Sequence, residues 1–514
     1  FYIQNFHLYK YAISTLSLCL SLARSLARSF GFVFLHVASL HRVSTSPLQF
    51  TSSGPKGAGV LMKKELAALL FLLAFSSAVE RALGRSDGLC DQKRSIEPRP
   101  HSVSILEFGA VGDGKTSNTL AFQNAIFYLK SFAEKGGAQL YLPAGCWLTG
   151  SFNLTSHLTL FLDKEAVILG SQDYENWRTV EPLPSYGRGL DVPGRRYRSL
   201  ISGDNLTDVV ITGDNGTING QGSVWWELFN SHSLNFSRPH LVEFVSSEDI
   251  IISNLTLLNT PAWNIHTAYC SGVLIQNITA CAPPESPLTS GIIPDSSQSV
   301  CIEDCNITTG HDAISLKSGW DEYGITYGRP TTGVHIRGAR LRSAVGTALS
   351  FGSEMSGGIS DIVAEHLLLD HSLSGIGLKT CRGRGGYIKD VLVSDVELRS
   401  VGIAIQATGQ FGVHPDDRFD PNALPVVQGI TLSNMVGINI TIAGNLSGID
   451  ASVFSSVCLS NISLSATFPW VCSNVSGYSR NVSPEPCPDL HRPFTNSSGD
   501  CFSLLGSIHW AAVL

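Results

Sequence analysis

The stretch IIISNLTL (250–257) alternates apolar and polar residues on either side of an asparagine, and this pattern returns along the chain. Counted from Ile250, positions +2, +5 and +7 are apolar, and they are nearly always apolar in the later copies. Those copies begin at Val273, Val300, Val334, Ile362, Val391 and Ile430. Alternation with a period of two is typical of strands. Each copy therefore predicts two short strands joined by a two-residue bend.

The +4 residue of each copy lies in this predicted bend. In order along the chain it is Asn254, Asn277, Asp304, Gly338, His366, Asp395 and Asn434. Six of these seven residues belong to types that tolerate the left-handed backbone that a bend requires. The copies start 23 to 39 residues apart, which indicates one solenoid coil with loops of varying length. Because one coil cannot bury its apolar face alone, the sequence predicts stacked coils around one core, an all-β parallel β-helix.

The N-terminal part of the chain has the composition of a targeting segment. Residues 62–80 combine Met62, two lysines, an apolar run and small residues, as a secretory signal peptide does. Residues 1–61 contain no Asp or Glu, which fits either translated upstream sequence or an organelle transit peptide, and the signal peptide that follows favours the first. We therefore assign 81–490 to one solenoid domain and 491–514 to a C-terminal tail.

Composition limits the partners of this domain. The net charge is −7 without a basic cluster, so we expect no nucleic acid. After the signal peptide, no apolar run reaches the roughly 20 residues of a membrane span. Eleven cysteines follow the signal peptide, and the chain carries 13 Asn-x-Ser/Thr sequons. Disulfides and sequons are typical of secreted glycoproteins, so we expect an extracellular protein.

The repeat also predicts individual side chains. Asn254 and Asn277 occupy bends of successive coils, where their amides can stack into a hydrogen-bonded ladder, so we expect neither sequon to carry a glycan. Cys305 falls on an inward position and Cys301 on an outward one, so the two should not pair, and Cys305 should be a buried thiol. The cysteines expected to staple the C-terminal region are Cys458, Cys472, Cys487 and Cys501.

Two further segments suggest a family. GHDAISLKSGWDEYG (310–324), preceded by TSGIIPDSS (289–297), resembles the active-site segments of the polygalacturonases, glycoside hydrolase family 28. SILEFGAVGDGKTSNTLAFQNAI (104–126) and NTPAWNIHTAYC (259–270) are similar to other segments of that family. The resemblance implies a right-handed β-helix with a short N-terminal capping helix. It also implies a secreted, monomeric glycosidase of the cell wall that needs no cofactor or metal. Such an enzyme cleaves α-1,4-galacturonosyl or related linkages of pectic polysaccharide or oligogalacturonides.

The family's catalytic pattern is only partly retained. Inverting glycosidases use two carboxyl groups, about 6.5–9.5 Å apart, one as acid and one as base. Carried over by motif, the first family Asp is Ser290, and the following Asp pair is His311–Asp312. The family's Arg-x-Lys, which holds the galacturonate carboxylate, reads Gly377-Leu378-Lys379. Asp312 and Lys379 are therefore the retained residues.

From the resemblance we assign Asp312, Asp295 and His311 as catalytic candidates. A histidine is largely protonated at mildly acidic pH, so His311 could donate a proton. The substrate-binding candidates are Lys379, Lys317, Glu354 and Arg384, and Glu354 is also an alternative member of the acid–base pair. Residues at similar positions in consecutive coils stack on one face, which predicts a shared groove.

Three activities remain open from these residues. In the first, the acid–base pair is redistributed and the protein is a hydrolase of polygalacturonate or of a substituted pectin such as rhamnogalacturonan. Alternatively, Ser290 and His311 record a lost activity, and the protein binds pectin without cleaving it. A pectate lyase on the same architecture would need clustered carboxylates for Ca²⁺, and the 289–317 segment offers no tight cluster of this kind.

Overall fold

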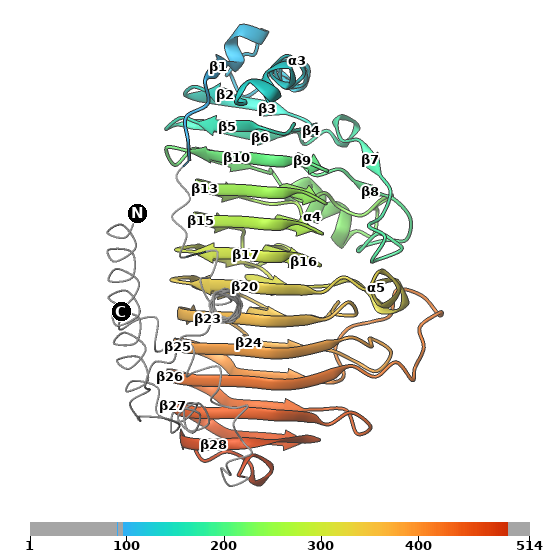
Figure 1. The fold of residues 1–514 in the computed structure, drawn as a ribbon, viewed down its shortest axis with the longest axis vertical. Helices are drawn as coiled ribbons and strands as arrows, with labels where there is room; N and C mark the ends of the chain where they lie inside the picture. Colours follow the sequence, from blue (N-terminus) through green and yellow to red (C-terminus); the bar gives the residue numbers. More distant parts are fainter. Residues whose placement is uncertain (1–89, 91–95, 492–514) are drawn as a thin grey trace, which may run out of the picture. The chain divides into compact units, whose positions relative to one another are not determined.

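Strands stacked in parallel make up the computed structural model, which describes Cys90 and residues 96–491 (Figure 1). The predicted signal peptide, the segment before it and the tail beyond His491 lie outside the described residues. Within them, 26 strands form one hydrogen-bonded system with parallel ladders, and only the short pair β7 (Thr179–Val180) and β8 (Arg196–Tyr197) forms a separate antiparallel sheet. The predicted all-β parallel β-helix is therefore confirmed.

The strands of successive coils pair in the register that the repeat predicts. Strand β13 (Glu248–Leu258) pairs with β15 (Ser271–Cys281), with Ile250 opposite Val273. All seven +4 residues, including His366, have left-handed backbone with φ between 51° and 64°. Some coils continue as one strand through the bend, whereas the next coil is split into β17 (Gln298–Glu303) and β18 (Asn306–Thr309).

Asparagines at the bends form the predicted ladder. Asn277 Nδ2 donates to Asn254 Oδ1 at 2.9 Å. A second ladder, which we did not predict, joins Asn461 to Asn434 and Asn481 to Asn461, each at 3.2 Å. These side chains satisfy one another at a turn where the backbone requires a left-handed conformation.

The core runs the length of the solenoid. Ile252, Ile275 and Ile302, at the same position of successive coils, are fully buried. Burying an isoleucine contributes roughly 1.5–3 kcal/mol, and stacking repeats this gain in each coil. At the N-terminal end, helix α3 (Thr119–Leu129) covers the core with Phe122 stacked on Phe152, and it is the predicted capping helix (Figure 1).

The cysteines behave largely as expected. Cys301 forms a disulfide with Cys90, while Cys305 is a buried free thiol whose pKa is raised by burial to about 12. Cys472 and Cys487 are bonded to each other in the last coils, as part of the predicted C-terminal staple. Among the described residues, no helix is long and apolar enough to cross a membrane.

One face of the solenoid carries the candidate residues. Its strands, in consecutive coils, are β12 (Val242–Val245), β14 (Trp263–Ala268), β16 (Ser290–Asp295), β19 (Ile314–Leu316), β22 (Thr347–Phe351) and β24 (Ser374–Lys379). Beside this face stand helix α5 (Asp321–Tyr327) and two long loops. Loop 181–195 joins β7 to β8, and loop 409–425 joins β25 (Tyr387–Thr408) to β26 (Val426–Ser447).

Candidate active site

Asp312 lies directly before β19, and the end of β24 places Lys379 beside it. Lys379 Nζ is 2.7 Å and 2.8 Å from the two Asp312 oxygens, and Thr347 N donates to Oδ1 at 2.9 Å. Burial alone would raise the pKa of Asp312, but Lys379 and His311 outweigh it and hold this pKa well below its usual range. Asp312 is therefore a buried, permanently ionised carboxylate.

His311 is the accessible member of this group. Its side chain is 25% exposed, and its Nδ1 lies 3.5 Å from Asp312 Oδ1. Burial lowers the pKa of His311, although Asp312 opposes this change. Lys379 and Lys317 lower it further, so both ammonium groups are close enough to act on this imidazole. An anionic ligand placed beside His311 would raise the pKa again and restore its proton.

A second lysine–carboxylate pair lies at the opposite end of β19. Lys317, at the end of β19, forms an ion pair with Glu354, which also accepts a hydrogen bond from Ser353 Oγ at 2.8 Å. Burial would raise the pKa of Glu354, but Lys317 and Arg384 lower it to about 2. Lys317 Nζ also lies 5.6 Å from the centroid of the Trp263 ring. The two ion pairs and His311 form the site we call the groove cluster: His311, Asp312, Lys317, Glu354 and Lys379.

Ser290 lies beside this cluster. Gly291 N donates to Asp312 O at 3.0 Å, so the start of β16 and the start of β19 are neighbours. The position at which the family has its first Asp therefore adjoins Asp312, and a hydroxyl occupies it here.

Asp295 lies in a different environment. It is fully buried at the end of β16, where Tyr186 Oη donates to Oδ2 at 2.6 Å and His266 Nε2 lies 3.2 Å away. Burial and the Asp295 charge raise the pKa of Tyr186 well above its usual range, so Tyr186 remains a donor. Because Tyr186 covers this carboxylate, Asp295 could act as the second catalytic acid only if Tyr186 moved. The sequence could not show this, since Tyr186 is 109 residues away.

His266 links Asp295 to a buried ion pair. Its Nδ1 lies 3.0 Å from Glu243 Oε1, and Arg196 Nη1 lies 2.7 Å from both Glu243 oxygens. Burial lowers the pKa of His266, but the two carboxylates outweigh this and raise it, which favours an imidazolium between two anions. His266 lies within the family-like segment NTPAWNIHTAYC, which gives it no particular role, and Glu243 and Arg196 lie in stretches without a recognisable motif.

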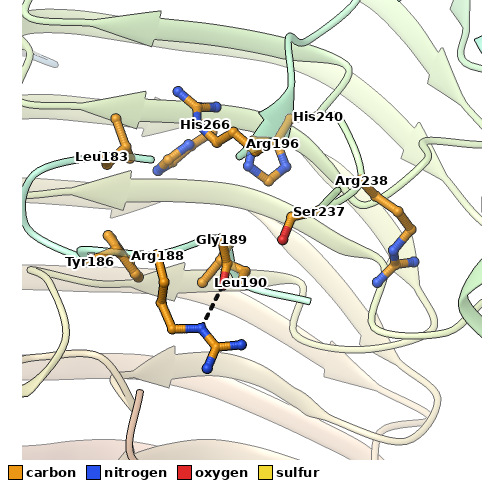
Figure 2. Close-up of a pocket in the computed structure, with 10 residues that line it drawn as sticks. All are labelled: Leu183, Tyr186, Arg188, Gly189, Leu190, Arg196, Ser237, Arg238, His240 and His266. Atoms are coloured by element: carbon orange, nitrogen blue, oxygen red, sulfur yellow. Dashed lines mark hydrogen bonds between the residues drawn. The ribbon is translucent and has the colours of Figure 1, made fainter. Parts of the chain in front are cut away.

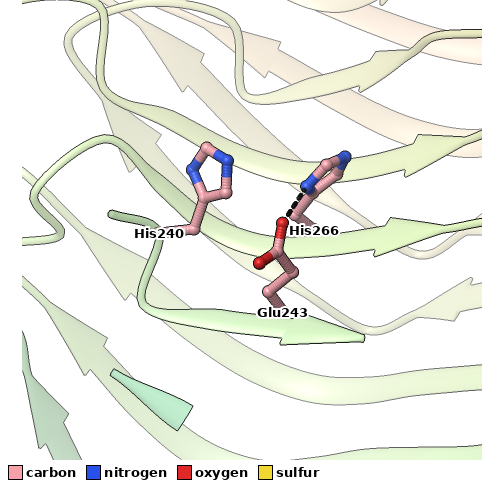
Figure 3. Close-up of side chains that lie close together, drawn as sticks. All are labelled: His240, Glu243 and His266. Carbon is pink, nitrogen blue, oxygen red and sulfur yellow. Dashed lines mark hydrogen bonds and ion pairs between the residues drawn. The ribbon is translucent and has the colours of Figure 1, made fainter. Parts of the chain in front are cut away.

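Glu243 and His266, together with His240, lie close enough to one another to be considered as metal ligands. Atoms of His240, Glu243 and His266 lie within 4.8 Å of one another (Figure 3). However, both ring nitrogens of His266 face carboxylates, and the Arg196 guanidinium already neutralises Glu243. This donor set fits an ion-pair network better than a cation site.

Arg384 lies away from the groove cluster's open side. It is fully buried, forms an ion pair with Asp321 and donates to Ser353 O at 2.8 Å and Val413 O at 2.9 Å. This placement does not fit the expected contact with substrate. Arg384 instead joins α5 to two loops, and its charge acts on the groove only through the pKa of Glu354.

A small pocket, with an enclosed volume of about 20 Å³, lies between loop 181–195 and the strand face (Figure 2). Its lining includes three arginines and two histidines: Arg188, Arg196, Arg238, His240 and His266. Arg196 Nε is buried without a hydrogen-bond partner. Two of these arginines already have carboxylate partners, Arg196 with Glu243 and Arg238 with Asp191.

Ion-paired carboxylates on one face of a parallel β-helix suit the acid–base chemistry of glycoside hydrolases. Residues 191–483 match the model of the glycosyl hydrolases family 28, and the chain belongs to this family.

Relatives agree with this placement. The chain is 49% identical over 426 residues to a probable polygalacturonase of Vitis vinifera, covering 80% of this chain and 87% of the relative. An exopolygalacturonase from Thermotoga maritima shares the fold with a TM-score of 0.67 and 24% identity, over 77% of this chain and 94% of that one. A polygalacturonase from Erwinia carotovora shares it with a TM-score of 0.60 and 21% identity, over 76% and 99%.

Proposed function

We propose that this protein is a secreted hydrolase of cell-wall pectin that cleaves α-1,4-galacturonosyl or related linkages with inversion. Membership of glycoside hydrolase family 28 and the likeness to the grapevine probable polygalacturonase support the substrate class. The observation that carries the proposal is the ionised Asp312 held by Lys379, with His311 open beside it.

The groove cluster suggests how the roles divide. Asp312 is ionised at all relevant pH values, so it can accept a proton from water or stabilise an oxocarbenium ion, but it cannot donate. His311 is the candidate donor. Its Nδ1 is 3.5 Å from Asp312, closer than the roughly 6.5–9.5 Å between the carboxyl groups of an inverting pair. The far nitrogen, Nε2, is therefore the atom we expect to protonate the leaving oxygen.

Substrate charge would complete this arrangement. Lys379 and Lys317 present ammonium groups near His311, and a galacturonate carboxylate is their natural counter-ion. A carboxylate bound there would compete for lysine and raise the pKa of His311. The proton donor would then be charged when the substrate is in place.

A second candidate function is pectin binding without cleavage. Both carboxylates of the groove cluster are held ionised by a lysine, and Ser290 adds no carboxyl group beside them. A site without a protonated carboxyl group retains affinity for uronates but loses general acid catalysis if His311 cannot replace it. Loss of a general acid typically costs about 10²–10⁴-fold in rate.

One experiment separates the two functions. Protein starting near Leu83 is incubated at mildly acidic pH with polygalacturonate, oligogalacturonides and rhamnogalacturonan, and new reducing ends and product unsaturation are scored. Hydrolysis predicts saturated products that disappear in Asp312→Asn and persist in the control Asp390→Asn, an exposed bend residue. Circular dichroism checks that both variants fold. Binding without products supports the second function, and unsaturated products would indicate a lyase and contradict both.

A further inference from the structure

The loop between β7 and β8 lies directly on the strand face next to the groove cluster. Tyr186 covers Asp295 through a 2.6 Å hydrogen bond. Four residues further, Leu190 packs against Trp263 and Ile293, the outward residues of β14 and β16. Side chains that would form the floor of a continuous groove on these two strands are therefore buried under the loop.

Loop 181–195 is held in place by contacts with loop 409–425 and with helix α5. Arg188 Nη1 donates to Pro415 O at 2.6 Å, which ties loop 181–195 to loop 409–425 across 227 residues of sequence. At Gly187, whose φ is +68°, an added Cβ would lie 2.2 Å from the Tyr323 ring. The loop therefore packs against α5 without space between them, and residues from three parts of the chain hold it in place.

The two sides of the groove cluster differ as a result. On the N-terminal side, Ile293, Asp295 and His266 have almost no exposed surface. On the C-terminal side, Gln406 and Phe411 remain partly exposed, and Phe411 lies under the ammonium of Lys379 at 4.9 Å. Exposed surface therefore continues from the cluster toward β25, whereas the face is covered at β16.

The space that remains on the closed side is small. The enclosed part of the pocket under the loop has a volume of about 20 Å³, enough for about one water molecule. Arg188, Arg196 and Arg238 line it, and the last two are paired with Glu243 and Asp191. This space is too small for a sugar ring, and it offers no path for a chain.

We infer that the protein recognises the end of a pectic chain, and that loop 181–195 is the element that excludes internal segments. The inference rests on the proposed function and adds its mode of action. Hydrolysis then proceeds from a chain end, and each cut releases a short uronate product. Specificity for the end comes from closure of the groove at β16, where Leu190 and Tyr186 cover the strand face.

Binding tests this inference independently of catalysis. Asp312→Asn protein is titrated with oligogalacturonides of increasing length at equal concentration of chains. End recognition predicts a dissociation constant per chain that stays nearly constant once the site is filled. An open groove would instead predict an about tenfold lower constant for an about tenfold longer chain, because each chain offers more internal sites. That result, or no binding at any length, would overturn the inference.

Products give the second test, with unmodified protein and polygalacturonate. End attack raises reducing ends while viscosity stays almost unchanged, and Arg188→Ala, which releases the loop from Pro415, should increase the viscosity loss per bond cut. Arg195→Ala, an exposed neighbour paired with Glu181, is the control and should behave as the unmodified protein. A rapid fall in viscosity with unmodified protein contradicts end recognition and leaves the proposed hydrolysis standing. End-dependent binding without any product would support end recognition and contradict the proposed hydrolysis.

Discussion

Lys379 and Asp312 form a buried ion pair, with the ammonium 2.7 Å and 2.8 Å from the two carboxylate oxygens, although 67 residues separate them in sequence. The pair joins β24 to the start of β19 across the intervening strand β22. It fixes the carboxylate that the Gly-His-Asp motif retains from the family pattern. The pair therefore stabilises the contact between these strands, and under the proposed function Lys379 also binds the uronate carboxylate.

Lys379→Met should destabilise the fold and abolish uronate binding. Methionine fills similar space but leaves Asp312 buried without its cation, and breaking a buried pair in this way typically costs about 3–5 kcal/mol. Urea denaturation gives the free energy of unfolding, and oligogalacturonide titration gives the affinity. Lys389→Met, at an exposed lysine, is the control. An unchanged affinity in a folded Lys379→Met protein would exclude Lys379 from recognition.

Stability should fall in acid through the second ion pair. The pKa of Glu354 is about 2 in the folded protein, against an ordinary value of 4.5, so the unfolded chain binds the extra proton between these values. The stabilisation is therefore complete above about pH 4.5 and is lost as the pH falls toward 2. Denaturation midpoints between pH 2 and 6 should show this slope, and Glu354→Gln should flatten it. Glu285→Gln, at an exposed loop residue, should leave the slope unchanged.

Much of the fold was predictable because the repeat is a local signal. Each coil repeats apolar positions in phase, and each bend restricts residue type, so Asn254 and Asn277 could be placed from sequence alone and their hydrogen bond is confirmed. Even His366, the residue type least suited to the bend, adopts φ 54°. Stacking on both sides determines the backbone there more strongly than the preference of the residue.

The candidate site was predictable only where residues occupy the same phase of neighbouring coils. This condition places Asp312, Lys317 and Lys379 on one face. Asp295 and Arg384 differ because loops reach them from elsewhere: Tyr186 covers the first, and Asp321 and Val413 hold the second. Loop contacts depend on residues far apart in sequence, and no periodicity encodes them.

The asparagine ladder should contribute measurably to stability. Asn277→Ala removes the hydrogen bond to Asn254 and forces a side chain with Cβ to remain at φ 51° without an amide, which we expect to cost about 1–2 kcal/mol. Asn277→Gly tolerates this backbone, so it reports loss of the hydrogen bond alone and should cost less. Chemical denaturation of the two variants gives the free energy of unfolding lost with the hydrogen bond and the further loss caused by the left-handed backbone. Equal losses would show that backbone conformation contributes nothing at this bend.

Substitutions that restore the two missing family Asp residues test which group donates the proton in this site. Ser290 adjoins Asp312, and His311 occupies the position of the first Asp of the family pair, so Ser290→Asp and His311→Asp place three carboxyl groups around one point. Crowded like charges raise the pKa of at least one of them, which supplies a protonated acid beside an ionised base. We expect the double variant to hydrolyse polygalacturonate about 10²–10⁴-fold faster than the unmodified protein if that protein lacks an effective acid. Initial rates of reducing-end formation for both single variants and the double variant measure this gain. A slower double variant would instead show that His311 is already the working proton donor, and that the present site is adapted to it.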